Sequence, residues 1–131
     1  LGDDLLMLHL ISAAIFTCTP VAVYDGDGPI ICESGEKIRI ASISAREIDG
    51  TCRAGHPCPA ASGIAARDAL VALLGRPTGR WKTGHISVSG PPIRCVASGR
   101  SYGRIVASCT LPDGRDLGEA MLSTGTVVPW S

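Results

Sequence analysis

Apolar and polar positions alternate along the chain in a pattern that predicts short strands, separated by turns, and two helices. Six runs rich in Val and Ile predict the strands. They cover residues 19–25, 29–34, 37–43, 85–89, 93–98 and 103–111. In the third run, Ile38 and Ile40 alternate with Lys37 and Arg39, so the Arg39 side chain is expected on the face opposite the two isoleucines.

Apolar residues at helical spacing occur after the third predicted strand and again near the end of the chain. An Ala-rich helix is expected from about Ala60 to Leu74, and a shorter helix over residues 117–125 ends at Gly125. Strands followed by a helix, more strands and a short helix fit a small closed barrel of the α+β class, such as a five- or six-stranded OB-type barrel. A disulfide-linked β-sandwich is the alternative, although two helices fit it poorly.

Length and charge narrow the possible functions. With 131 residues, the chain is long enough for one domain with its own core. Twelve basic and twelve acidic side chains cancel, so a strong electrostatic hold on long nucleic acid is not implied. Most of the basic residues are arginines, whose planar guanidinium groups suit phosphate. An anion site in this chain is therefore expected to be local.

Six cysteines in a short chain indicate an oxidising compartment, so the protein is expected to be secreted or periplasmic. Sequence order suggests the pairs Cys18–Cys32, Cys52–Cys58 and Cys95–Cys109, with Cα separations of about 4.4 to 6.8 Å. The alternative is a zinc site in the segment CRAGHPC (52–58), which contains His56. A zinc site is the weaker prediction, because no CxxC pair is present and His56 is the one nearby imidazole.

The amino-terminal residues 1–17 contain an apolar stretch over residues 5–17. This stretch is too short to span a bilayer and has the length of a signal-peptide core, so residues 1–17 are interpreted as a remnant export signal. The alternative is an apolar segment that packs on the domain. Residues 18–131 are expected to form that domain, with no stable membrane insertion.

Four motifs occur in an order that resembles the staphylococcal (thermo)nuclease family. Asp25-Gly26-Asp27 is similar to the family's Asp-Gly-Asp-Thr signature. KIRIASISAREID (37–49) is similar to its Arg-Leu-x-x-Ile-Asp-x-Pro-Glu segment. SYGRIVA (101–107) resembles its Tyr-Gly-Arg segment, and DLGEAMLSTG (116–125) resembles its closing helix. The resemblance covers residues 19 to about 130 and implies a five-stranded OB-type barrel.

The resemblance also implies a chemistry, because the family hydrolyses phosphodiesters of DNA and RNA with one Ca²⁺ and two arginines. Each family role is carried over to the matching position of this chain. The implied catalytic residues are Arg39, Glu47 and Arg104; the implied substrate contacts are Tyr102 and Arg100; the implied metal ligands are Asp27, Ser44 and Ala45. Glu47 would position or deprotonate the attacking water, and the two arginines would bind the phosphate.

Several positions depart from the family pattern. Ser44 replaces a metal-binding carboxylate, so Ca²⁺ is expected to be held weakly. Gly28 replaces the signature threonine, and Arg46 replaces a proline before Glu47. The expected function is that of an exported monomeric phosphodiesterase acting on DNA or RNA. The alternative is a catalytically inactive module of the same fold that binds nucleotides or a protein partner. Asp25 is interpreted as a turn residue.

Overall fold

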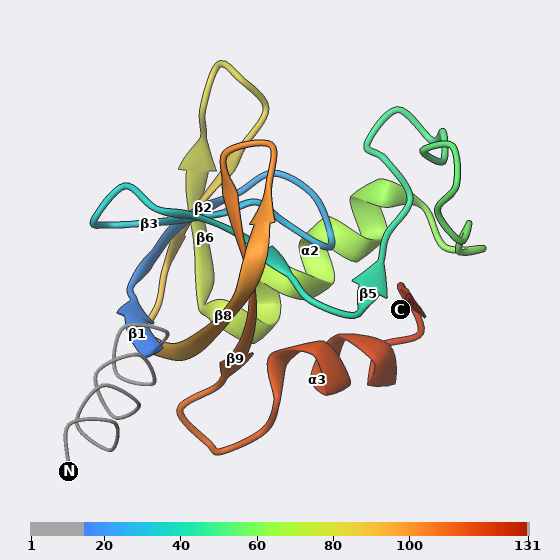
Figure 1. Cartoon of the computed structure of the whole chain (residues 1–131). Helices are drawn as coiled ribbons and strands as arrows, with labels where there is room; N and C mark the ends of the chain where they lie inside the picture. Colours follow the sequence, from blue (N-terminus) through green and yellow to red (C-terminus); the bar gives the residue numbers. More distant parts are fainter. Residues whose placement is uncertain (1–14, 131) are drawn as a thin grey trace, which may run out of the picture.

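Short strands build one curled sheet in the computed structural model, which describes residues 15–130 (Figure 1). The strands are β1 (Ile15–Cys18), β2 (Pro20–Val23), β3 (Ile30–Cys32), β4 (Lys37–Ile40), β5 (Ile43–Ser44), β6 (Arg76–Arg80), β7 (Ile86–Ser89), β8 (Ile93–Ser101), β9 (Arg104–Thr110) and β10 (Val128–Pro129). Eight of them follow the order β1-β8-β9-β4-β3-β2-β7-β6, and β5 pairs with β10 separately. Only β4 and β9 are parallel among the paired strands of the described chain.

The sheet curls like half a barrel, and two helices pack against it, which gives a barrel-type α+β fold (Figure 1). Helix α2 (Gly63–Leu74) begins at Ser62, whose hydroxyl accepts a hydrogen bond from the Ala65 N–H at 3.0 Å. Helix α3 (Leu117–Ser123) begins in the same way at Asp116. Buried isoleucines and valines of the strands meet the apolar faces of both helices and form one core.

The six predicted strands and both predicted helices are present. The predicted strand over residues 37–43 is divided, because β4 ends at Ile40 and Ile43 begins the separate strand β5. Three further strands, β1, β6 and β10, were not expected. Strand β6 is exposed along its whole length and contains a proline and a glycine, so its sequence lacks the apolar pattern of a strand. Its backbone pairs with the edge of the sheet at β7. Strand β10 has only two residues. Strand β1 pairs with β8, although its first three residues, 15–17, were assigned to an export signal.

The rest of that assigned segment lies outside the described residues. Within residues 15–130, no helix is long and apolar enough to cross a membrane. Helix α2 begins at Gly63, three residues after the expected start.

All three expected disulfides are present, so the zinc alternative for the segment 52–58 is wrong. The Cα separations are 5.2 Å for Cys18–Cys32, 5.5 Å for Cys52–Cys58 and 4.0 Å for Cys95–Cys109. The last value lies below the expected range, because Cys95 and Cys109 face each other directly across β8 and β9. Three disulfides are typical of a protein in an oxidising compartment.

Candidate active site

The turn after β2 holds Asp27 in a fixed position. The Asp27 N–H donates to Oδ1 of Asp25 at 3.2 Å, and the Asp27 carbonyl accepts from the Ile40 N–H at 2.9 Å. Gly28 follows with φ +113°, and a Cβ added there would lie 2.4 Å from the carbonyl oxygen of Ile38. Only glycine fits this position, because the backbone conformation and the close approach both exclude a side chain. The threonine of the family signature therefore has no room here.

Arg39 binds the Asp27 carboxylate from the neighbouring strand β4. Oδ2 of Asp27 lies 3.5 Å from Nη2 of Arg39 and accepts a hydrogen bond from the Ala45 N–H at 3.0 Å. The guanidinium also donates to the carbonyls of Ile40 at 2.7 Å and Ile43 at 3.1 Å. Arg39 is only 6% exposed, so it is a fixed, buried cation rather than a solvated strand residue.

Two adjoining cavities lie over this pair. One has a volume of about 320 Å³ and is lined by Tyr24, Asp25, Asp27, Pro29, Lys37, Arg39, Glu47, Arg53, His56, Tyr102 and Arg104. The other, of about 750 Å³, extends to Trp130 and is also lined by residues of β8, β9, the end of β4 and the segment 52–58. The two cavities share five lining residues: Arg39, Arg53, His56, Tyr102 and Arg104. We call the two cavities together the cleft.

The structure brings five of the predicted site residues to the 320 Å³ cavity. They come from the turn after β2, from β4, from the loop after β5, from the β8–β9 turn and from the start of β9: Asp27, Arg39, Glu47, Tyr102 and Arg104. The Glu47 carboxylate has no hydrogen-bond partner within residues 15–130, so it is free to bind a ligand or water. Tyr102 is 91% exposed at the tip of its turn, and the Arg104 Nε donates to the Ser101 carbonyl at 3.2 Å.

Three predicted site residues do not line the cleft. Arg100 lines a separate cavity of about 450 Å³ with Phe16 and Glu36. Successive strand residues point to opposite faces, so Arg100 faces away from its neighbour Ser101, which does line the cleft. The other two, Ser44 and Ala45, are buried in the core beside the cleft.

Among the residues matched to the family's calcium ligands, Asp27 alone has a carboxylate. Ser44 is 1% exposed, and its hydroxyl donates to the Pro57 carbonyl at 3.3 Å. Of the three matched positions, only Asp27 presents its side chain to the cleft. Among residues 15–130, no group of three or more His, Cys, Asp or Glu side chains is arranged to hold a metal. The expectation of a weakly held Ca²⁺ remains a prediction from the resemblance.

Asp25 belongs to the site, although its sequence position suggested only a turn. It is 6% exposed, and burial, followed by the nearby Asp27 and Glu47 carboxylates, raises the pKa of Asp25 to about 9. Asp25 therefore holds its proton at neutral pH, and its Oδ1 accepts the hydrogen bond from the Asp27 N–H. The short spacing of the two aspartates was the sequence signal that Asp25 lies beside Asp27 in the site.

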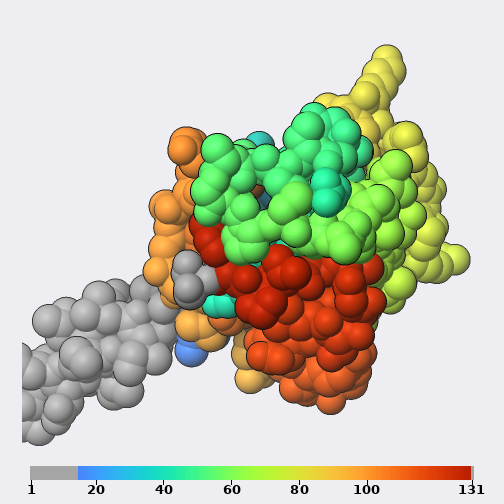
Figure 2. Space-filling view, turned by 90° about the vertical axis from the view of Figure 1, so that its right-hand side faces the viewer, coloured from blue at the N-terminus to red at the C-terminus, as the bar shows by residue number. Residues whose placement is uncertain are grey.

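Sequence analysis also missed the contribution of the Cys52–Cys58 segment, which carries Arg53 and His56 into the cleft. The His56 ring lies 3.9 Å from the Trp130 ring, centroid to centroid. The guanidinium of Arg39 lies 4.9 Å from the Trp130 centroid, which is within cation–π range. Figure 2 shows the loop after β5 (green) lying against the C-terminal part of the described chain (red).

Burial, followed by Arg39 and Arg53, lowers the pKa of His56, so this imidazole is neutral at neutral pH. The available sequence signal was the position of CRAGHPC, which begins five residues after Glu47.

No protein-family model matches this chain. Among curated proteins, the chain is similar to the succinoglycan biosynthesis protein ExoI of Rhizobium meliloti (strain 1021), with 30% identity over 125 residues. The aligned region covers 95% of this chain and 58% of ExoI, so the chain spans little more than half the length of that relative.

Proposed function

We propose that this protein is an exported phosphodiesterase of the staphylococcal nuclease type, with an OB-type five-stranded barrel within its curled sheet, and that it hydrolyses DNA or RNA as a monomer. The observation that carries this proposal is the convergence of Asp27, Arg39, Glu47, Tyr102 and Arg104 on one cavity. Their separate origins in the chain make this convergence informative, because a chance motif match does not require it.

The side chains of this cavity supply the parts that phosphodiester hydrolysis needs. Arg39 and Arg104 bind the non-bridging oxygens of the phosphate and stabilise the charge that develops on them. Glu47 accepts a proton from the water whose oxygen attacks phosphorus. The P–O bond to the leaving alcohol breaks, and that alcohol leaves with a proton taken from the site or the solvent. Tyr102, at the exposed rim, contacts the substrate phosphate.

A digestion assay tests this proposal. Plasmid DNA and a single-stranded RNA are incubated with the protein in EDTA, Ca²⁺, Mg²⁺ or Mn²⁺. We expect cleavage that falls at least about 100-fold in Glu47→Gln, the usual loss when a general base is removed. Arg94→Gln is the matched control, because Arg94 is an exposed arginine on β8 that does not line the cleft. Absence of cleavage under every metal condition would refute the enzymatic proposal.

A second candidate function is a binding module without catalysis. The observation that favours it is the Ser44 hydroxyl, which is bonded to Pro57 where the family has a metal-binding carboxylate. The relative named for succinoglycan biosynthesis suggests an oligosaccharide as one ligand for such a module, and OB-type barrels commonly bind oligosaccharides or oligonucleotides. Binding of an oligonucleotide or oligosaccharide without cleavage in the same assays would favour this function.

A further inference from the structure

We infer that the Cys52–Cys58 loop (residues 52–58) completes the anion site, placing Arg53 in the cleft so that the cleft binds a phosphate group without a metal ion. This inference rests on the proposed function, since it takes a phosphate ester as the ligand. It adds a residue that the family resemblance does not supply, and it removes the metal requirement that the resemblance implies.

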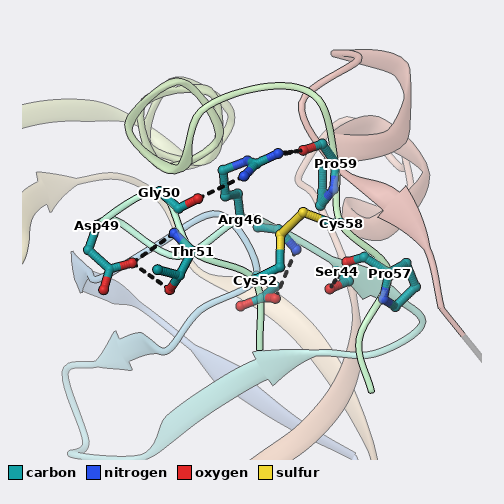
Figure 3. Close-up of a disulfide and its surroundings, with 11 residues drawn as sticks. Ser44, Arg46, Asp49, Gly50, Thr51, Cys52, Pro57, Cys58 and Pro59 are labelled. Carbon is teal, nitrogen blue, oxygen red and sulfur yellow. Dashed lines mark hydrogen bonds between the residues drawn. A yellow bond between two sulfur atoms is a disulfide. The ribbon is translucent and has the colours of Figure 1, made fainter. Parts of the chain in front are cut away.

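Ser44 and Arg46, which depart from the family pattern shortly before Glu47, both form hydrogen bonds that hold this loop (Figure 3). The Ser44 hydroxyl donates to the carbonyl of Pro57, inside the loop. The Arg46 guanidinium donates to the carbonyl of Pro59, just after the loop, at 2.7 and 3.1 Å, and to Gly50, just before it, at 2.7 Å. Together with the Cys52–Cys58 disulfide, these hydrogen bonds hold both ends of the loop beside the cleft.

The fastened loop adds a cation to the cleft. The Arg53 guanidinium lies 5.9 Å from the centroid of the Tyr102 ring, so the loop faces the β8–β9 turn across the cleft. Within residues 15–130, neither Arg53 nor Arg104 forms an ion pair with an acidic side chain. Both guanidinium groups are therefore available to an anionic ligand, and their planar geometry suits a phosphate.

The balance of charge in the 320 Å³ cavity favours an anion. Four cationic side chains line it: Lys37, Arg39, Arg53 and Arg104. They outnumber the three acidic side chains of the same lining, Asp25, Asp27 and Glu47. The family uses a divalent cation to offset such carboxylates and the phosphate together. Here the arginine supplied by the loop provides positive charge at the same place.

His56 supports this arrangement from the same loop. Its ring rests on Trp130, and it lines both cavities of the cleft. A neutral imidazole offers one donor and one acceptor nitrogen, so it can hydrogen-bond a phosphate oxygen without adding a charge. Asp27 and Glu47 raise the pKa of His56 in part, against the larger lowering by burial and by Arg39 and Arg53.

Calorimetric titration with adenosine 5′-monophosphate tests the inference, because this phosphomonoester is not a substrate for phosphodiester cleavage. The full chain, with its disulfides intact, is titrated in EDTA and in millimolar Ca²⁺. We expect affinities that agree within about twofold in the two buffers, since binding does not depend on the metal. Arg53→Gln should weaken binding at least about tenfold, the usual effect of losing a charge-assisted hydrogen bond.

Arg94→Gln is again the matched control and should bind as the wild type does. Thermal unfolding of Arg53→Gln should match the wild type as well, since Arg53 is exposed. Adenosine without phosphate should bind much more weakly than the monophosphate, and equal binding of the two would overturn the phosphate assignment. Binding that requires Ca²⁺, or that survives Arg53→Gln unchanged, would overturn the inference and leave the proposed nuclease function standing. If no binding occurs in either buffer and no cleavage is found, both proposals fail.

Discussion

Replacing Ser44 by aspartate tests two ideas about position 44. The first is that the Ser44 side chain stabilises the fold, and the second is that position 44 matches a metal-ligand position of the resembled family. Ser44 is 1% exposed, and its hydroxyl donates a hydrogen bond to the Pro57 carbonyl. An aspartate there loses the donor and turns a carboxylate towards a carbonyl oxygen. It also approaches Asp27, whose Oδ2 accepts the N–H of the next residue, Ala45, at 3.0 Å. We therefore expect Ser44→Asp to be less stable than the wild type in metal-free buffer.

The expected loss is about 3 kcal/mol, the lower end of the range for an uncompensated buried charge. For a domain of this size, this loss corresponds to a fall in Tm of roughly 10 to 15 °C. Calcium should restore part of it, because the cation would neutralise the carboxylates of Asp27 and the new aspartate. At a Ca²⁺ concentration of about 100 times the Kd, the recovery is about 2.7 kcal/mol. The wild type should show no comparable response to Ca²⁺.

Thermal unfolding followed by circular dichroism, in EDTA and in Ca²⁺, gives both quantities. Ser108→Asp is the matched control, because Ser108 is exposed on β9 and its replacement should change Tm little in either buffer. An unchanged Tm of Ser44→Asp in EDTA would refute the burial argument. A lowered Tm with no gain from Ca²⁺ would refute the assignment of position 44 to the family's metal site.

Two further predictions concern the turn and the loop around the cleft. Arg46→Met keeps the aliphatic stem but removes the hydrogen bonds to Gly50 and Pro59. It should lower the free energy of unfolding in urea by about 2 kcal/mol, and an unchanged midpoint would contradict the fastening role. The pKa of Asp25 is about 9 in the folded protein and near 3.8 when unfolded, so between these values the folded state holds the extra proton and this group makes stability fall as pH rises. The free energy of unfolding of Asp25→Asn should exceed that of the wild type by an amount that grows from pH 4 to pH 9, by at most about 1.4 kcal/mol per pH unit. Urea unfolding across this range measures this difference. A difference that does not change with pH would mean that Asp25 is ionised throughout and would contradict the prediction.

The parts of the fold with a clear apolar pattern could be predicted from the sequence. The valine- and isoleucine-rich strands bury one face in the core, so their pattern reports their environment. Strand β6 could not be predicted in this way, because its residues are all exposed and only its backbone pairs with β7. Strand β1 was missed for a different reason. A short apolar run at the start of a chain fits a signal peptide as well as an edge strand.

The candidate site was predictable where a motif fixes residue types and spacing. Arg39, Glu47 and Arg104 reached one cavity as the order of the motifs suggested. Arg53 and His56 were not predicted, because their position depends on how a disulfide-closed loop folds over the cleft. Loop placement depends on backbone carbonyls as partners, and a sequence does not show which carbonyl a side chain will reach.

The departures at positions 44 and 46 are better explained together than as separate losses. Each side chain donates to a backbone carbonyl that flanks Cys58, Ser44 to Pro57 and Arg46 to Pro59. A family aspartate at position 44 has no proton to donate at neutral pH, and a family proline at position 46 has no side-chain donor. The family residues would therefore leave these two carbonyls without side-chain donors and loosen the loop. Ser44 and Arg46 therefore do more than mark the loss of a metal ligand. They are the residues that hold the Cys52–Cys58 loop in place, and that loop carries Arg53 into the cleft.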